Sequence, residues 1–480
     1  MPKNLFGTTE KSNFILNMSP VTLQKWVAAM LMICIIVPQL GSFIIEAFQI
    51  NNSLMGAFLY LSGFGSVLFF IIAMLKKEQS FKENPVYIPV IILPVLAFAS
   101  YYKVFLTSGD ASNELVRTAL EGELGRYEGL LAIIAYAGIF LLATVIAKKK
   151  TVNVLLDTIV GIGIVQAVIA VFQHIPGLNF LTSYADLPTM ALKNVMLSSG
   201  LSESPIFYGT FLTIVSGVAF IGAIYDENVI RARIYGAAAL LFVLTGLFTS
   251  SIVPIIGIGC VIILCTITVL MNRKIEFDNG VLKTPVKRYA ALIAASAVIV
   301  LAVVFIQGIY IRDKEIAYFD AYYRLFIVNN FSPVDKRSLY EIAWGRSIDI
   351  IKENLLLGVG PDCMAKYQIN SKELLVNIID KSYNEYLYIA ATRGIISAAA
   401  FIAFAVMMLV RGVKNLGKFS ANKNNWYIPA LLISLGAYLV QAFFSASTVS
   451  TAPLFWLLAG ILSARKIEEE NVPKSKKKNK

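Results

Sequence analysis

Residues 252–271 read IVPIIGIGCVIILCTITVLM, a run that contains no charged side chain. A run of about 20 apolar residues is long enough to cross the hydrocarbon core of a bilayer as a helix. Similar runs recur along the whole 480-residue chain, which is 57% hydrophobic and only 15% charged. Because backbone polar groups in lipid must find partners within their own segment, repeated runs of this kind predict a bundle of helices.

The chain is therefore predicted to be an all-α polytopic membrane protein with about twelve transmembrane helices. Helices 1–9 are expected within residues 26–309 and helices 10–12 within 390–464, with short tails at 1–25 and 465–480. A large, partly helical loop at 310–389 separates the two groups of helices. The predicted spans are 26–46, 54–75, 86–105, 129–147, 152–173, 206–225, 234–250, 252–271, 289–309, 390–411, 426–445 and 450–464.

Lysine and arginine gather in alternate connections between these spans, for example at Lys148-Lys149-Lys150 and at Arg273-Lys274, and in both tails. Such residues favour the cytoplasmic side of a membrane. We therefore expect a multi-pass protein of the cytoplasmic membrane with both termini in the cytoplasm and the 310–389 loop outside. This distribution explains most of the net charge of +12 without a nucleic-acid partner. Membrane lipids are the expected surroundings, and the lysine-rich C-terminal tail is suited to anionic lipid.

The four cysteines and the single histidine indicate no redox or metal site. Three of the cysteines lie in apolar spans and the fourth lies alone in the long loop, so no disulfide framework is implied. His174, at the end of the fifth predicted span, is interpreted as a structural residue.

The long loop contains the polar motifs on which a functional interpretation depends. Residues 338–354 carry apolar side chains at helical spacing, which predicts a helix. Leu357-Gly358-Val359-Gly360-Pro361 then predicts a turn. Residues 380–393 are expected to lead into the tenth span.

Several of these motifs resemble the O-antigen ligase and polymerase family, whose members are bacterial membrane glycosyltransferases with a large extracytoplasmic loop. The resemblance covers roughly residues 120–462. It rests on Gly125-Arg126-Tyr127-Glu128-Gly129-Leu130, Arg337 to Trp344, Gly358-Val359-Gly360-Pro361, Tyr383-Asn384-Glu385-Tyr386-Leu387, Arg393-Gly394-Ile395, Tyr438 to Phe444 and Ala452 to Trp456.

The resemblance implies transfer or polymerisation of a glycan from an undecaprenyl diphosphate carrier to a glycan or lipid acceptor, as either a ligase or a polymerase. It implies no cofactor and no metal. Arginines suit this reaction because they hold phosphate oxygens in two-point contacts and stabilise charge that grows on the leaving diphosphate. Arg337 and Arg126 match arginines of the family, and an ordinary salt bridge is the alternative interpretation of each. Asn384, Arg393 and Trp344 are assigned to the same diphosphate or glycan site.

Two positions depart from the family pattern. Tyr383 stands where the family usually has a catalytic histidine, and Ile252 stands where an arginine is expected. A tyrosine with an ordinary pKa of about 10 is a poor base at neutral pH, although nearby arginines would lower that pKa. We therefore take Tyr383 and Glu385 as the candidate catalytic residues.

Two other functions remain open. A transporter or flippase for lipid-linked saccharides would need several charged or polar side chains deep within the spans. A family member that binds the lipid-linked glycan without transferring it would explain the two departures.

Overall fold

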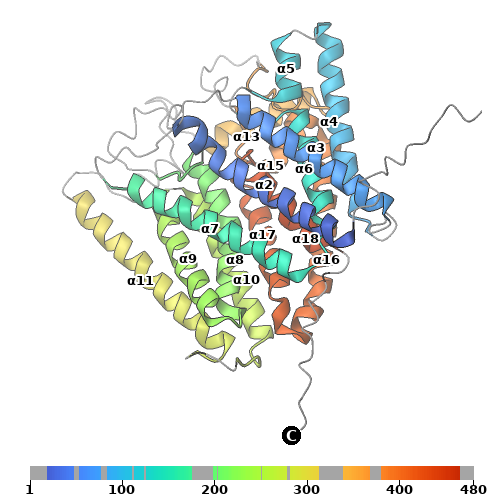
Figure 1. Cartoon of the computed structure of the whole chain (residues 1–480). Coiled ribbons are helices and arrows are strands. Elements are labelled where there is room, and N and C mark those ends of the chain that lie inside the picture. Colours follow the sequence, from blue (N-terminus) through green and yellow to red (C-terminus); the bar gives the residue numbers. More distant parts are fainter. Residues whose placement is uncertain are drawn as a thin grey trace, which may run out of the picture.

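The structure of the chain is a computed structural model. It describes residues 19–47, 53–76, 84–110, 113–123, 126–175, 198–202, 204–249, 251–277, 280, 282–312, 339–367, 380–464 and 467. Within these ranges the protein is a bundle of helices without a β-strand (Figure 1).

Every predicted span overlaps an apolar helix of the bundle. These helices are α2 (Pro20–Ala47), α3 (Ser53–Leu75), α4 (Tyr87–Ser108), α6 (Leu130–Ala143), α7 (Lys149–Gln173), α8 (Pro205–Tyr225), α9 (Val229–Phe248), α10 (Ile252–Met271), α11 (Pro285–Arg312), α16 (Ile395–Ala421), α17 (Tyr427–Gln441) and α18 (Ala452–Ser463).

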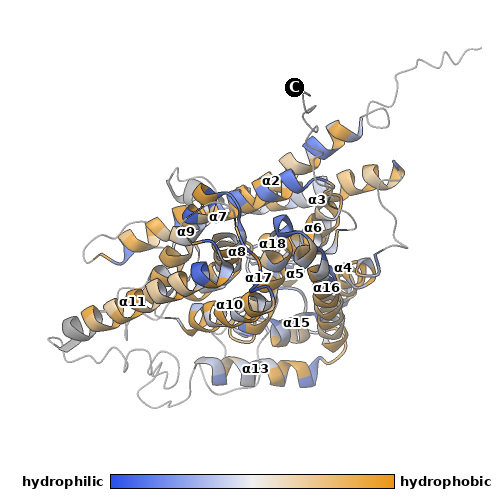
Figure 2. Ribbon diagram, turned by 90° about the horizontal axis from the view of Figure 1, so that it is seen from below, coloured by the Kyte–Doolittle hydropathy of each residue, from blue (hydrophilic) through white to orange (hydrophobic). Residues whose placement is uncertain are grey.

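Within the described ranges, eight helices are long and apolar enough to cross a membrane, namely α2, α4, α7, α8, α9, α10, α11 and α16. Apolar stretches of α3, α6 and α18 are shorter. The outward faces of the peripheral helices are also apolar, as the orange residues of α11 show in Figure 2. Val298, Leu301 and Phe305 of α11, for example, are more than half exposed. The prediction of an all-α polytopic membrane protein is confirmed.

Helix α8 lies at the centre of the bundle, where it packs against α9, α10 and α17. Small residues let these helices approach closely, because a larger side chain at the contact would hold the backbones apart. A Cβ added to Gly217 would lie 2.7 Å from the Cα of Ser434 in α17. A Cβ added to Gly257 of α10 would lie 2.7 Å from the Cβ of Thr213.

The basic turns between helices meet at one end of the bundle, which we call the basic end. Arg231 at the start of α9 pairs with Asp226 at the end of α8. Arg288 of α11 donates to the Asp226 carbonyl at 2.7 Å, and Lys423 before α17 pairs with Glu227 at 3.1 Å. These contacts join the ends of α8, α9, α11 and α17 at a place where lysine and arginine are concentrated.

The opposite end carries three polar helices, and we call it the α15 end after one of them. They are α5 (Glu114–Glu121), α13 (Leu339–Glu353) and α15 (Glu385–Arg393). Helix α13 matches the helix predicted over 338–354. Figure 2 looks down the bundle and shows α13 from the side, so this helix lies across the bundle rather than along it.

The start of the tenth span differs from the prediction. The span expected at 390–411 is interrupted by Gly394, which separates α15 from α16. Gly394 has φ +85°, and a Cβ there would collide with the Leu356 carbonyl, so the helix cannot continue through this position. Helix α15 is consequently an element of its own, and α16 begins at Ile395.

Some predictions fall outside the described residues. These are Arg337, most of the N-terminal tail, and the C-terminal tail from residue 468.

Candidate active site

Four segments that are distant in sequence meet at the α15 end. They are the turn 126–129 before α6, the turn 358–362 after α13, the segment 380–384 before α15, and the segment 442–448 before α18. The Glu385 amide donates to the Ala442 carbonyl at 2.8 Å, and the Val359 and Gly360 amides donate to the carbonyls of Ala391 and Thr392 at 3.0 and 2.9 Å. The turn 358–362 thus supplies hydrogen-bond donors to carbonyls at the end of α15 that have no partner within the helix.

Helix α15 begins with a side-chain cap. The side-chain oxygen of Asn384 accepts a hydrogen bond from the Leu387 amide at 3.1 Å, which is the usual capping arrangement. Asn384 therefore fixes the first turn of the helix and with it the position of Glu385.

Two parallel ion pairs join the 126–129 turn to the 380–384 segment. Arg126 Nη1 lies 2.7 Å from Asp380 Oδ2. Lys381 Nζ lies 2.6 and 2.8 Å from the two carboxylate oxygens of Glu128, with side-chain exposures of only 2% and 8%. The Lys381 ammonium also lies 4.9 Å from the centre of the Phe207 ring. The Lys381 ammonium and the Glu128 carboxylate are therefore two charges held in fixed positions within the site.

Two further carboxylates are held by hydrogen bonds. Glu385 accepts from the hydroxyl of Ser447 at 2.9 Å and also from the Ser447 amide. Asp362 accepts from the Tyr388 hydroxyl and from the Glu123 amide, each at 2.8 Å. Both residues are buried, and their hydrogen bonds replace the water that a buried carboxylate loses.

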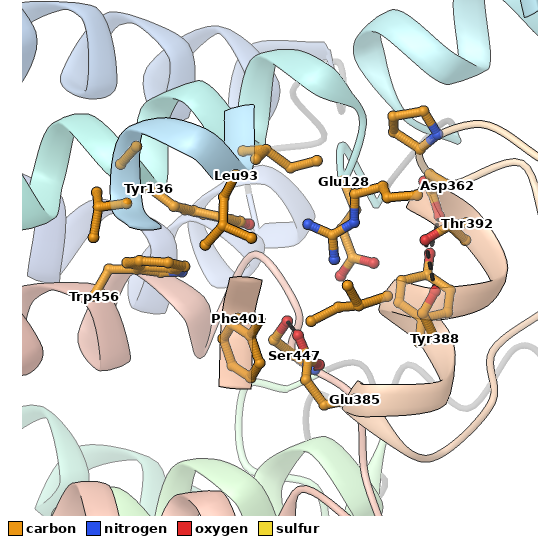
Figure 3. Close-up of a pocket in the computed structure, with 16 residues that line it drawn as sticks. Leu93, Glu128, Tyr136, Asp362, Glu385, Tyr388, Thr392, Phe401, Ser447 and Trp456 are labelled. Atoms are coloured by element: carbon orange, nitrogen blue, oxygen red, sulfur yellow. Dashed lines mark hydrogen bonds between the residues drawn. The ribbon is translucent and has the colours of Figure 1, made fainter. Parts of the chain in front are cut away.

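These carboxylates line a cavity of about 40 Å³. Figure 3 shows its polar side, with Glu128, Asp362 and Glu385, facing an aromatic and apolar side formed by Tyr136, Leu93, Phe401 and Trp456. Arg393, the last residue of α15, also lines the cavity. Its guanidinium forms no hydrogen bond or ion pair with any described residue, so its donors remain available to a bound group.

The sequence of residues 237–402 matches the family model described as O-antigen ligase. We refer to residues 237–402, after this similarity, as the O-antigen ligase domain. No curated protein matches the chain. The matched region runs from α9 into α16, so it includes α13 and α15 with Trp344, Tyr383, Asn384, Glu385 and Arg393.

Two parts of the chain outside the matched residues also contribute to the candidate site. Arg126 and Glu128 precede α6, and Ser447 precedes α18, so all three lie outside the matched residues. They reach the domain through the Asp380 and Lys381 ion pairs and through Glu385.

Tyr383 lies in an aromatic cluster of the domain rather than in open solvent. Its ring meets Tyr340 edge to face with ring centres 6.3 Å apart, and Tyr340 meets Trp344 in the same way at 6.2 Å. Burial raises the pKa of Tyr383, the Asp380 carboxylate raises it further, and Arg126 only partly opposes them. The phenol is therefore neutral at physiological pH, contrary to the expectation that nearby arginines would lower its pKa.

The backbone is strained at the same place. Tyr127, Asp362 and Tyr383 are the non-glycine residues with positive φ among those described, at 53°, 55° and 45°. Each such residue costs about 1–3 kcal/mol, and such strain clusters at functional sites. All three lie on segments that meet at this site.

The residues predicted from the sequence are distributed as follows. Arg126, Tyr383, Asn384, Glu385, Trp344 and Arg393 all lie on the segments and helices of the α15 end. Arg337 lies outside the described residues. His174 stacks on Phe248 with ring centres 3.8 Å apart and does not line the cavity.

Sequence reasoning did not select Glu128, Lys381, Asp362 or Ser447. Glu128 and Lys381 each belong to a polar motif next to an apolar span, and this position could have identified them as site residues. Asp362 and Ser447 had none, because an acid after a turn and a serine in a polar run are common in any chain.

Proposed function

We propose that the protein transfers or polymerises a glycan from an undecaprenyl diphosphate carrier to a glycan or lipid acceptor, as the O-antigen ligase domain suggests. One observation carries the proposal: the available guanidinium of Arg393, a residue of that domain, lines a cavity together with three carboxylates. A cation suits the diphosphate, and carboxylates and aromatic rings suit the hydroxyl groups and faces of a sugar.

The arginines would stabilise the leaving group. When the acceptor hydroxyl attacks the anomeric carbon and the bond to the diphosphate breaks, negative charge grows on the diphosphate oxygens. Arg126 and Arg393 are permanently charged donors close to the cavity, and Arg337 is the third candidate from the sequence. No metal or cofactor enters this scheme.

Tyr383 and Glu385 remain the candidates for the reacting centre. The neutral phenol of Tyr383 would donate a hydrogen bond to an oxygen of the substrate rather than remove a proton. Glu385 is an acceptor whose oxygens are oriented by Ser447. Asn384 would fix these two residues, and Trp344 would offer an apolar surface to the glycan.

The charge distribution supports an outward-facing site. Lysine and arginine are concentrated at the basic end, which is the end expected to face the cytoplasm. The α15 end would then face the outer side of the bacterial cytoplasmic membrane, where a lipid-linked glycan is presented to an acceptor.

The deciding experiment uses the full-length protein in liposomes with a fluorescent undecaprenyl diphosphate disaccharide, alone or with a hexose-terminated glycolipid. Release of undecaprenyl diphosphate with formation of a longer glycan would support polymerisation, and a labelled glycolipid would support ligation. Arg393→Ala should reduce this release at least about 100-fold, as expected for loss of one electrostatic contact to the transition state.

Arg117→Ala is the matched control, because Arg117 lies on α5 at the same end and its side chain is 67% exposed. Wild-type binding of the donor without any release would identify a non-catalytic binder. Movement of the intact donor between leaflets without release would identify a flippase. Equal rates in wild type and Arg393→Ala would rule out Arg393 as a site residue.

A further inference from the structure

The ion pair between Arg126 and Asp380 is the most open contact of the site. The side chains of Arg126 and Asp380 are 19% and 38% exposed, whereas those of the neighbouring pair are 8% or less. Nη1 of Arg126 is buried and forms no hydrogen bond with any described residue, although it lies 2.7 Å from Asp380 Oδ2. The pair is therefore held mainly by charge, in an orientation poorer than that of a good hydrogen bond.

Asp380 differs from the other carboxylates of the site in how it is held. Glu128 is held by a buried ammonium, and Glu385 and Asp362 each accept two hydrogen bonds. Arg126 is the one partner of Asp380 among the described residues. If another anion takes Arg126, Asp380 is left with no bonding partner in this part of the chain.

We infer that Asp380 occupies the position of a donor phosphate on Arg126 until the donor arrives, and that the displaced carboxylate then accepts the proton of the acceptor hydroxyl. The inference rests on the proposed function and adds an identified proton acceptor to it. Tyr383 cannot take this part as a neutral phenol, and the oxygens of Glu385 are already engaged by Ser447.

The step balances as follows. The acceptor oxygen forms a bond to the anomeric carbon while the bond from that carbon to the diphosphate oxygen breaks. The electron pair of the broken bond stays on the diphosphate, whose charge is held by Arg126. The acceptor proton passes to Asp380, which becomes neutral and returns the proton to water after the product leaves.

The surroundings of the displaced carboxylate are positively charged and firmly held. Arg346 is close enough to interact with Asp380 electrostatically. Its own guanidinium is anchored by bonds of 2.8 and 2.9 Å to the carbonyls of Met364 and Tyr367. Lys381, the next residue, is fixed by Glu128, so the backbone at Asp380 cannot move far.

Asp380→Asn tests the inference because it should strengthen binding of the donor while it slows turnover. Loss of the competing charge frees Arg126, so the KM for the fluorescent donor and the Kd for undecaprenyl diphosphate should both fall, roughly three- to tenfold. Loss of the proton acceptor should lower kcat about 100-fold or more. Asp380→Glu keeps the charge and should recover part of kcat.

Asp349→Asn is the control. Asp349 is a carboxylate of α13 whose side chain is 53% exposed and which pairs with Lys352 at 3.0 Å. Its removal should leave kcat and Kd within about twofold of wild type, because exposed pairs contribute little. A kcat of Asp380→Asn close to that of wild type would overturn the assignment as proton acceptor. A Kd that is unchanged or higher would overturn the displacement by phosphate.

Failure of the proposed glycan transfer can be distinguished from failure of the displacement of Asp380 by phosphate. If wild-type protein releases no carrier, glycan transfer is not supported, yet the Kd comparison between wild type and Asp380→Asn still tests the displacement. Inorganic pyrophosphate as a competitor separates recognition of the diphosphate from recognition of the lipid chain. Equal melting temperatures for both proteins in detergent would show that the variant is folded.

Discussion

Glu128 and Lys381, which are 253 positions apart in the sequence, form a buried ion pair with distances of 2.6 and 2.8 Å. The pair joins the turn before α6 to the segment that carries Asp380, Tyr383 and Asn384. It therefore ties the turn before α6 to the O-antigen ligase domain.

Removing one partner of this pair should strongly destabilise the protein. Lys381→Met leaves the Glu128 carboxylate buried without its ammonium, which we expect to cost about 3–5 kcal/mol. The double variant Glu128→Gln with Lys381→Met should recover much of this loss, because no buried charge remains. Melting temperatures in detergent measure the effect, and Arg117→Met, at an exposed pair, should change little. Equal melting temperatures for wild type and Lys381→Met would contradict the prediction.

Tyr383 should act as a neutral hydrogen-bond donor across the physiological pH range. Burial, with a further contribution from Asp380, raises its pKa above the ordinary value, so the phenol stays protonated as pH rises from 6 to 10. Tyr383→Phe should therefore lower kcat while leaving the shape of the pH–rate profile unchanged. If Tyr383 were a phenolate base, wild-type activity would instead rise towards high pH, and this rise would vanish in the variant.

Tyr383→His restores the residue that the related family carries. A higher rate in this variant would indicate that the tyrosine site is degenerate. We expect a lower rate, because the packing of the ring against Tyr340 fits the tyrosine that is present. The measurement is carrier release by the full-length variant, with Tyr383→Phe measured alongside.

Gly394→Ala should destabilise the junction between α15 and α16. The position has φ +85°, and the added Cβ would collide with the Leu356 carbonyl. Gly417→Ala is the matched control, because Gly417 lies within α16 and an added Cβ meets no atom within 4 Å. We expect the melting temperature to fall for Gly394→Ala and to stay level or rise for Gly417→Ala. The opposite order would show that the junction is not as described.

Lys103→Met should loosen the turn beside the cavity. The Lys103 ammonium donates to the side chain of Asn354 at 2.8 Å and to the Gly358 carbonyl at 2.9 Å, which ties α4 to the turn 358–362. Loss of these bonds should cost about 1.5–3 kcal/mol. Lys352→Met, at a side chain that is 70% exposed, is the control. Hydrogen exchange of the 358–362 amides should increase in the first variant only.

Much of the fold could be predicted from the sequence because the length of an apolar run sets the length of the membrane helix that it forms. The helices α8 and α10 begin and end within one residue of the predicted spans 206–225 and 252–271. The break at Gly394 was missed, since a glycine between two helical stretches is common and its positive φ depends on contact with Leu356. The gathering of Arg126 with the 380–393 segment was suggested only by family resemblance, because spacing along the chain contains no information on such contacts.

The sequence by itself determined that this chain is a bundle of membrane-crossing helices with a polar loop before its last apolar helices. It could do so because hydrophobicity and helix length are local properties. Only the tertiary structure decided which charges are paired: Lys381 with Glu128 and Asp380 with Arg126, leaving the Arg393 donors available at a cavity. The reason is physical, since the pairing of charges depends on distances between helices that no local property of the chain specifies.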